Sequence, residues 1–214
     1  MDNSFVGGIP RLPANQSIPV CKFCGSDQTF FFQIALPATN PWEGLSLAVF
    51  SCTRCADREH LIPEMLNVPL RGADIPAGFL EAYQTNFKFL VFKTDTAEIK
   101  NEYRPKIRFA AVSLEPSRDS NVNDNKVGGR PNWALEDESP KTYAGRTPMF
   151  FLLQFQSGYK FSLLEGAPPQ IELALDRTPQ PSPLSYYQLF IGNALFLFGT
   201  ENRSESLVYA ITQV

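Results

Sequence analysis

The residues best suited to chemistry in this 214-residue chain are its cysteines, which form two Cys-x-x-Cys pairs, Cys21/Cys24 and Cys52/Cys55. Each such turn places two sulfurs on the same side of a tight loop, and two facing turns make a tetrahedral cage of four thiolates. Zinc prefers this ligand set. Because four thiolates leave no open coordination position, the sequence predicts a structural Zn²⁺ ion bound by these residues.

Two other interpretations of the cysteines stay open, namely two disulfides or a redox-active dithiol. Disulfides form in oxidising compartments, and Met1–Pro13 has neither the basic nor the apolar region of a secretory signal. A redox Cys-x-x-Cys usually opens a helix in a βαβ unit, whereas both pairs here border strand-like runs. His60, the single histidine, follows the second pair and is either a further ligand or a packing residue.

Strands are the elements that must position the cysteines. Between the two pairs lie 27 residues, with strand-like runs at Thr29–Leu36 and Leu45–Ser51. A hairpin of these two strands would return the second pair to the first. Further on, the pattern predicts a short helix over Ile75–Thr85 and strands over Lys88–Lys93 and Ile107–Leu114.

The chain repeats itself at an offset of 121 residues. Val127–Pro131 repeats the Val-Gly-Gly-x-Pro of Val6–Pro10, and the same offset carries Gln33 onto Gln154. The strand sequence FFFQIAL then lies over FLLQFQS, and with a side-chain period of two both copies keep one apolar face. Each glutamine falls on the other face, where it either contacts a ligand or bonds turn backbone. We interpret this as an internal duplication.

The predicted fold is mostly β, α+β at the margin, with two antiparallel sheet units around one shared core. The first repeat, 1–114, carries the zinc-ribbon-like four-cysteine site and the short helix. A polar loop covers 115–126. The second repeat, 127–214, has no cysteines, because Thr142 and Gly145 stand at the positions of the first pair. Its closing strand, Ala194–Phe198, matches the first repeat's Leu45–Phe50 after a proline-rich insertion at Gly166–Ser185.

Composition narrows the function classes. The formal net charge is −3 and the basic residues are scattered along the sequence, which argues against a nucleic-acid surface. The 18 phenylalanines supply a substantial core. The longest apolar run, Leu189–Phe198, is too short to span a bilayer. We therefore expect a soluble, cytoplasmic protein without a membrane or nucleic-acid partner.

The motifs resemble a known family. GGIP, CKFCG, FFFQIALP and LAVFSCTRC, followed by KVGGRPNW with FFLLQF, are similar to the YwqG-like proteins of bacteria and to the related eukaryotic programmed-cell-death-2 family. The chain departs from the eukaryotic pattern at Leu12, near the place of that family's first tryptophan, which Trp133 keeps in the second copy. The resemblance implies a duplicated β-rich fold. It also implies chaperoning of a nascent ribosomal protein for the eukaryotic members and immunity to a toxin for some bacterial ones.

A non-enzymatic binding protein is the function that these features favour. Most concretely it would be an immunity protein that neutralises a cognate toxin by surface occlusion, and the alternative is chaperone-like escort of a basic client such as a ribosomal protein. A single histidine gives little support to catalytic triads or metal hydrolases, so an enzyme is the weakest hypothesis.

Aromatic residues on loops are the expected anchors for the partner. The loops are Pro37–Gly44 with Trp42, Asn132–Ala144, and Gly166–Ser185 with the tyrosines that follow it. The predicted partner surface is on the second loop and comprises Trp133, Glu136, Asp137, Glu138 and Tyr143. Its acidic run is either a solvated loop or a rim that steers a basic partner.

Overall fold

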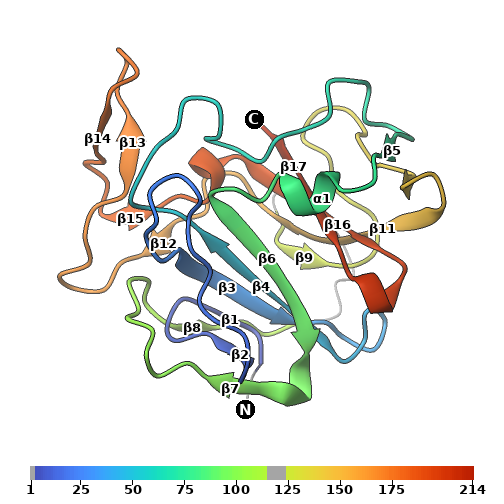
Figure 1. The fold of residues 1–214 in the computed structure, drawn as a ribbon, viewed down its shortest axis with the longest axis horizontal. Coiled ribbons are helices and arrows are strands. Elements are labelled where there is room, and N and C mark those ends of the chain that lie inside the picture. Colours follow the sequence, from blue (N-terminus) through green and yellow to red (C-terminus); the bar gives the residue numbers. More distant parts are fainter. Residues whose placement is uncertain (1–2, 115–123) are drawn as a thin grey trace.

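Two β-sheets form the body of the molecule in the computed structural model, which describes residues 3–114 and 124–214 (Figure 1). The first sheet is antiparallel and has the strand order β6-β4-β3-β1-β8. Its strands are β1 (Phe5–Val6), β3 (Thr29–Ala35), β4 (Leu45–Ser51), β6 (Phe87–Lys93) and β8 (Ala110–Ala111).

The second sheet has the order β17-β16-β11-β10-β5, and β9 also pairs with β11. Its strands are β5 (Asp74–Ile75), β9 (Lys126–Val127), β10 (Thr142–Tyr143), β11 (Thr147–Phe155), β16 (Ala194–Thr200) and β17 (Val208–Gln213). Only β5 runs parallel to its neighbour. Since β5 precedes residue 114, the chain crosses from the first repeat into the second sheet.

Three two-stranded ribbons and four short helical turns complete the described chain. The ribbons pair β2 (Arg11–Pro13) with β7 (Ala97–Ile99), β12 (Phe161–Ser162) with β15 (Tyr186–Tyr187), and β13 (Ile171–Leu173) with β14 (Pro179–Pro181). The helical turns are α1 (Phe79–Ala82), η1 (Thr94–Thr96), η2 (Phe190–Gly192) and η3 (Arg203–Glu205). The predicted mostly-β fold is confirmed. Among the described residues, none of these helices has the length and apolar character needed to cross a membrane.

The two sheets repeat the same strand pairing, as the duplication predicts. The ladder β1-β3-β4-β6 corresponds to β9-β11-β16-β17. Val6 faces Phe32 in the first ladder, and at the same offset Val127 faces Leu153 in the second. Both long strands also carry a register shift at matching places. The sequence repeat is therefore a repeat of register as well as of pattern.

The two Gly-Gly turns make equivalent backbone hydrogen bonds to the long strands β3 and β11. Gly7 donates its backbone N–H to the carbonyl of Phe31, and Gly128 donates to Leu152, at 2.9 and 2.7 Å. Gly7 has a φ of 60° and lies so close to Arg108 that a Cβ would overlap the Arg108 carbonyl. A residue with a side chain is excluded there by both conformation and space.

The two glutamines bond backbone, which confirms that interpretation of the pair. Gln33 Oε1 accepts from Arg11 N at 3.3 Å, and Gln154 Oε1 accepts from Asn132 N at 2.8 Å. The two donors are themselves 121 residues apart. Gln154 also donates through Nε2 to the carbonyl of Asp124 at 2.9 Å. Each glutamine thus ties the start of its repeat to the repeat's central strand.

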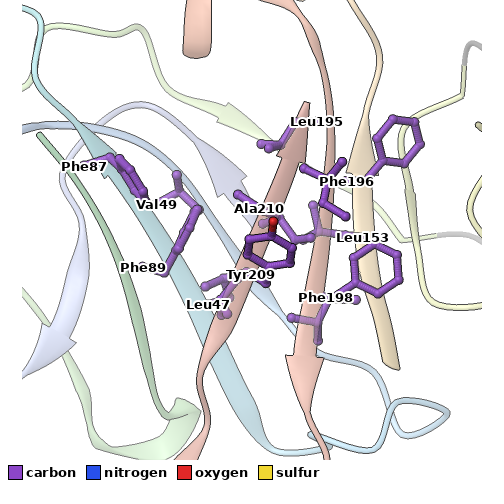
Figure 2. Close-up of a cluster of buried hydrophobic side chains, with 14 of the residues drawn as sticks. Leu47, Val49, Phe87, Phe89, Leu153, Leu195, Phe196, Phe198, Tyr209 and Ala210 are labelled. Atoms are coloured by element: carbon purple, nitrogen blue, oxygen red, sulfur yellow. The ribbon is translucent and has the colours of Figure 1, made fainter. Parts of the chain in front are cut away.

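The core lies between the sheets. Figure 2 shows side chains of β4 and β6 gathered near those of β16 and β17, including Leu47, Phe89, Leu195 and Tyr209. Phe32 and Phe155 stack across this core, with ring centroids 4.4 Å apart. Side chains of both repeats belong to one hydrophobic cluster.

Trp42 is part of this core, so the prediction of an exposed loop aromatic at this position is wrong. The side chain is fully buried, and its Nε1–H donates to the carbonyl of Thr200 at 2.8 Å. A Cβ at Gly199 would lie 2.8 Å from the Trp42 ring, so the glycine makes room for the tryptophan. The buried Trp42 side chain and its hydrogen bond to Thr200 therefore attach this loop of the first repeat to the second repeat.

The outer face of each sheet is covered by equivalent residues. Leu12 is fully buried in a second cluster that includes Phe50 on the back of the first sheet. Trp133, at the same repeat position, packs on Phe196 and Phe198 with centroid distances of 4.4 and 5.9 Å. The position that the resemblance compares is Leu12 in the first copy and Trp133 in the second. In both copies its side chain covers the outer face of the sheet.

Two predicted elements are shorter in the structure. The helix predicted over Ile75–Thr85 is reduced to α1, because Gly78 starts it in a left-handed conformation and the chain then turns towards β6. Gln84 makes that turn, since its side chain bonds the backbone of both Leu80 and Phe89. The strand predicted over Ile107–Leu114 is reduced to β8 and an isolated bridge at Ile107. Residues 115–123 of the predicted polar loop lie outside the described residues.

Candidate metal centre

The four cysteine sulfurs converge between two turns, which we call the first knuckle (residues 21–24) and the second knuckle (residues 52–55). All four Sγ atoms of Cys21, Cys24, Cys52 and Cys55 lie within 4.8 Å of one another. The nearest pairs are Cys52–Cys55 at 3.5 Å, Cys24–Cys52 at 3.6 Å and Cys21–Cys55 at 3.7 Å. All four are free thiols.

These distances fit a tetrahedral metal site. A metal with metal–sulfur bonds of about 2.3 Å holds its four sulfurs about 3.8 Å apart. A disulfide would bring two sulfurs to about 2.05 Å, so the predicted alternative of two disulfides does not match the geometry. The residues present could hold one metal ion, and no sulfur would be left over.

The first knuckle is a small closed loop. Val20 and Asp27 form an antiparallel bridge at its base, and the N–H of Cys21 donates to the carbonyl of Ser26 at 2.9 Å. Gly25 has a φ of 69°, which lets its N–H turn back to the carbonyl of Cys21 at 3.0 Å. The turn therefore holds its shape through backbone bonds.

The second knuckle continues directly from β4. The N–H of Cys52 donates to the carbonyl of Asn86 at 2.7 Å, and the N–H of Arg54 points at Cys52 Sγ at 3.4 Å. The side chain of Thr53 bonds Thr29 at 2.7 Å in the buried interior. Because β3 and β4 are paired, the hairpin brings the two knuckles together as the sequence predicts.

Without a metal ion, the pKa values of the cysteines do not favour four thiolates at this site. Burial raises the pKa of Cys52 to about 11, and burial together with the neighbouring cysteines raises the pKa of Cys55. Burial is the largest single influence on the pKa of Cys24 and raises it, but hydrogen bonds from Ser26, Cys55 and Cys52 together lower that pKa to about 7. A divalent cation at the centre would stabilise the remaining thiolates, and metal binding would then release protons.

His60 is not one of the grouped ligands. Among the described residues, the candidate metal group contains the four cysteines alone. The Nδ1 atom of His60 lies 2.6 Å from Asp57 Oδ1, and the His60 ring packs on Phe23 at a centroid distance of 4.7 Å. The hydrogen bond to His60 is the largest influence that lowers the pKa of Asp57. The geometry supports the packing interpretation of this histidine.

The second repeat closes the corresponding turn without cysteine. Asp74 Oδ1 accepts hydrogen bonds from the hydroxyl of Thr142 at 2.6 Å and from the N–H of Gly145 at 2.7 Å. Those two residues occupy the repeat positions of Cys21 and Cys24. One carboxylate from β5 therefore bonds the positions that hold sulfur ligands in the first repeat. Periodicity gave no signal for this residue, because Asp74 has no counterpart within the repeat.

The predicted partner surface on the loop at 132–144 is less open than expected. Tyr143 is buried, and its hydroxyl accepts from Gly78 N at 3.0 Å and donates to Glu81. Trp133 is half-buried against the sheet. The prediction of an exposed aromatic at Tyr143 is wrong, because its side chain is buried. The partner-binding role of the half-buried Trp133 stays a prediction.

Two of the three acidic residues in this loop, Asp137 and Glu138, interact with other residues. Asp137 Oδ1 accepts from Ser139 N at 2.9 Å, a bond that lowers the pKa of Asp137, and its other oxygen lies 3.6 Å from Arg71. Glu138 accepts from Gln213 at 2.9 Å. The side chain of Glu136 is exposed. The partner-binding role of this run stays a prediction.

A surface that the sequence did not predict adjoins the metal centre. A hollow of about 330 Å³ is lined by the second knuckle, His60, the base of the β13–β14 hairpin and Ile191. Phe23 and Ile191 are large apolar residues exposed at 43 and 51%. We call Phe23, His60, Ile191 and the β13–β14 hairpin the knuckle face.

The β13–β14 hairpin projects from the body at the upper left of Figure 1. Its base is bonded to the metal centre, because Ile171 N donates to the carbonyl of Thr53 between the two ligands of the second knuckle, at 3.0 Å. Leu175 at its turn is fully exposed. The alternating residues Ile171–Leu173 and the turn at Asp176–Thr178 are a hairpin signal that the prediction of a proline-rich insertion leaves out.

Comparison with protein-family models, with curated proteins and with solved structures finds no match to this chain. The resemblance to the YwqG-like and programmed-cell-death-2 families therefore stays an expectation that rests on the quoted motifs.

Proposed function

We propose that this protein is a non-enzymatic binding protein in which a structural Zn²⁺ ion at Cys21, Cys24, Cys52 and Cys55 supports a protein-binding surface. The resemblance to YwqG-like proteins makes a cognate toxin the first partner to test, neutralised by occlusion of its surface. Four metal-bound thiolates require a reducing compartment, so we place the protein in the cytoplasm.

The observation that carries the proposal is the backbone at Ile191. Ile191 has a φ of 55° and follows Phe190, which has a φ of 48°. A β-branched residue rarely adopts this conformation, and such strain of about 1–3 kcal/mol gathers at functional sites. Here the strained turn buries Phe190 and holds Ile191 out to solvent beside the hollow.

A metal ion at the four cysteines would stabilise the elements that form this surface. The thiolate set leaves no coordination position for a substrate, and its second knuckle bonds the base of the β13–β14 hairpin. Arg58 adds a hydrogen bond from its Nε to the carbonyl of Arg177 near the hairpin turn, at 3.3 Å. Exposed apolar side chains around a hollow are the anchors that dominate interface energetics.

The test is capture of the partner from the native host, followed by binding measurements with matched variants. Ile191→Asn removes the apolar side chain, and asparagine tolerates the left-handed conformation, so we expect lost binding without lost stability. Val68→Asn changes an apolar residue that is 57% exposed and does not line the hollow, and it should bind as wild type. Equal affinity of wild type and Ile191→Asn would remove the knuckle face from the proposal, and substrate turnover by wild type would overturn it.

The second candidate is escort of a basic client such as a ribosomal protein, and the exposed carboxylate of Glu136 favours it. Glu136→Gln would then weaken client binding, while Ile191→Asn would leave it unchanged. The opposite pattern supports the knuckle face and the first candidate.

A further inference from the structure

Cationic side chains from distant parts of the sequence line one open cleft of about 670 Å³. They are Arg54, Lys100, Arg104 and Lys106. The acidic residues in the lining are Asp27 and Glu102, so cations outnumber carboxylates two to one. The basic residues are scattered in the sequence, but the fold gathers four of them.

Two of the cations are withdrawn from solvent without a carboxylate partner. Lys100 is 8% exposed, and its Nζ donates to the carbonyl of Ala14 at 3.0 Å. Lys106 is half-buried and its Nζ donates to the hydroxyl of Thr29 at 3.0 Å. Within residues 3–114 and 124–214, no carboxylate lies within 4.0 Å of either ammonium group. Buried charges are ordinarily paired, and each ammonium has three N–H donors, so both keep donors for a ligand.

The cations also act on each other. Burial and the neighbouring Arg54 both lower the pKa of Lys106, and an anion between the two side chains would relieve this repulsion. Cys52 and Asp27 raise the same pKa, but burial and Arg54 outweigh them.

We propose that this cleft binds carboxylate side chains of an acidic segment of the partner protein, an inference that rests on the proposed binding function. None of the lining residues belongs to a helix, so the cleft has no helix N-terminus to hold phosphate. Asp27 and Glu102 would repel a multiply charged phosphate more strongly than a single carboxylate. The arginines can bind carboxylates with two parallel hydrogen bonds.

The test uses the metal-loaded full chain and a fluorescently labelled hexaglutamate peptide. Arg104→Glu should weaken peptide binding about tenfold or more, because it replaces a charge-assisted hydrogen bond with repulsion. Arg108→Glu is the matched control, since Arg108 is exposed, lies four residues further on and does not line the cleft. Glu102→Gln should tighten binding, and salt should weaken it.

Equal binding by the Arg104→Glu and Arg108→Glu variants, or no peptide binding by wild type, overturns the inference. Inorganic phosphate that binds with the same variant pattern while the peptide does not would replace carboxylate with phosphate as the ligand and also overturns it. Binding of the captured partner by the variants distinguishes this inference from the proposed function. Loss of the partner in Ile191→Asn but not in Arg104→Glu would leave the binding function standing without the acidic segment.

Discussion

Replacing Cys52 by serine is the sharpest perturbation of the metal centre. Serine differs from cysteine by one atom, so the change removes a thiolate and leaves the packing nearly intact. Cys52 is buried, and its backbone N–H is bonded to Asn86. We expect purified wild type to contain about one Zn²⁺ ion per chain and the Cys52→Ser variant to bind the ion more weakly through its three remaining cysteines.

The magnitude follows from the binding energy of the metal. A structural Zn²⁺ ion contributes about 10–16 kcal/mol to folding in small zinc domains, which is about 2.5–4 kcal/mol for each of four ligands if they share it equally. For a chain of about this size, 1 kcal/mol corresponds to roughly 2–4 °C in Tm. Cys52→Ser should therefore lower the Tm by roughly 5–16 °C.

The assay combines elemental analysis with thermal unfolding in the presence and absence of a zinc chelator. The chelator should lower the Tm of both proteins and bring the two values together, with the larger fall in wild type. Hydrogen exchange should locate the effect, because the amide of Ile171 depends on the carbonyl of Thr53 between the two ligands. That amide should be accelerated more in Cys52→Ser than the amides of β16 and β17, which report the global loss of stability. Wild type without metal but with the same Tm would refute the reasoning.

Three further predictions follow from the fold. Gln154→Leu should destabilise by about 1–3 kcal/mol because it removes the side-chain acceptor of the Asn132 backbone N–H. Chemical denaturation should show a smaller loss for Gln33→Leu, whose acceptor bond is longer at 3.3 Å. Asp74→Ala should destabilise by about 1 kcal/mol by removing the shared acceptor of Thr142 and Gly145, while Asp74→Asn keeps an acceptor oxygen; equal losses would contradict this role. Burial raises the pKa of Tyr209 from 10.0 to about 12, so between those values the unfolded chain binds fewer protons and stability falls as pH rises; denaturation at stepped pH should show a shallower fall for Tyr209→Phe.

Local patterns were enough to predict the metal centre and the repeat. The cysteine spacing is local, and the strands Thr29–Leu36 and Leu45–Ser51 agree with β3 and β4 almost residue for residue. The offset of 121 predicted a shared register because strand pairing is fixed by alternation along the chain. Both features can be seen without knowing which distant segments meet.

Exposure could not be predicted in the same way. Trp42 and Tyr143 sit in segments rich in glycine and polar residues, yet both side chains are buried against the other repeat or the β5 connection. Whether an aromatic on a loop is an anchor or a core residue depends on what covers it. The cleft around Lys100 and Lys106 was missed for the same reason, because its cations converge only after folding.

The two repeats close the equivalent turn in different ways. In the second repeat one carboxylate, Asp74, bonds the positions equivalent to Cys21 and Cys24, so this architecture can close the turn without a metal. Fold closure alone therefore does not explain four cysteines in the first repeat. What distinguishes that repeat is the second knuckle, where Thr53 between the ligands holds Ile171 at the base of the projecting hairpin. A metal that joined both knuckles would fix this hairpin relative to the sheet, whereas the Asp74 carboxylate closes only its own turn. On the proposed function, the cysteines would hold this surface in place, which makes the knuckle face the first region to test for a partner.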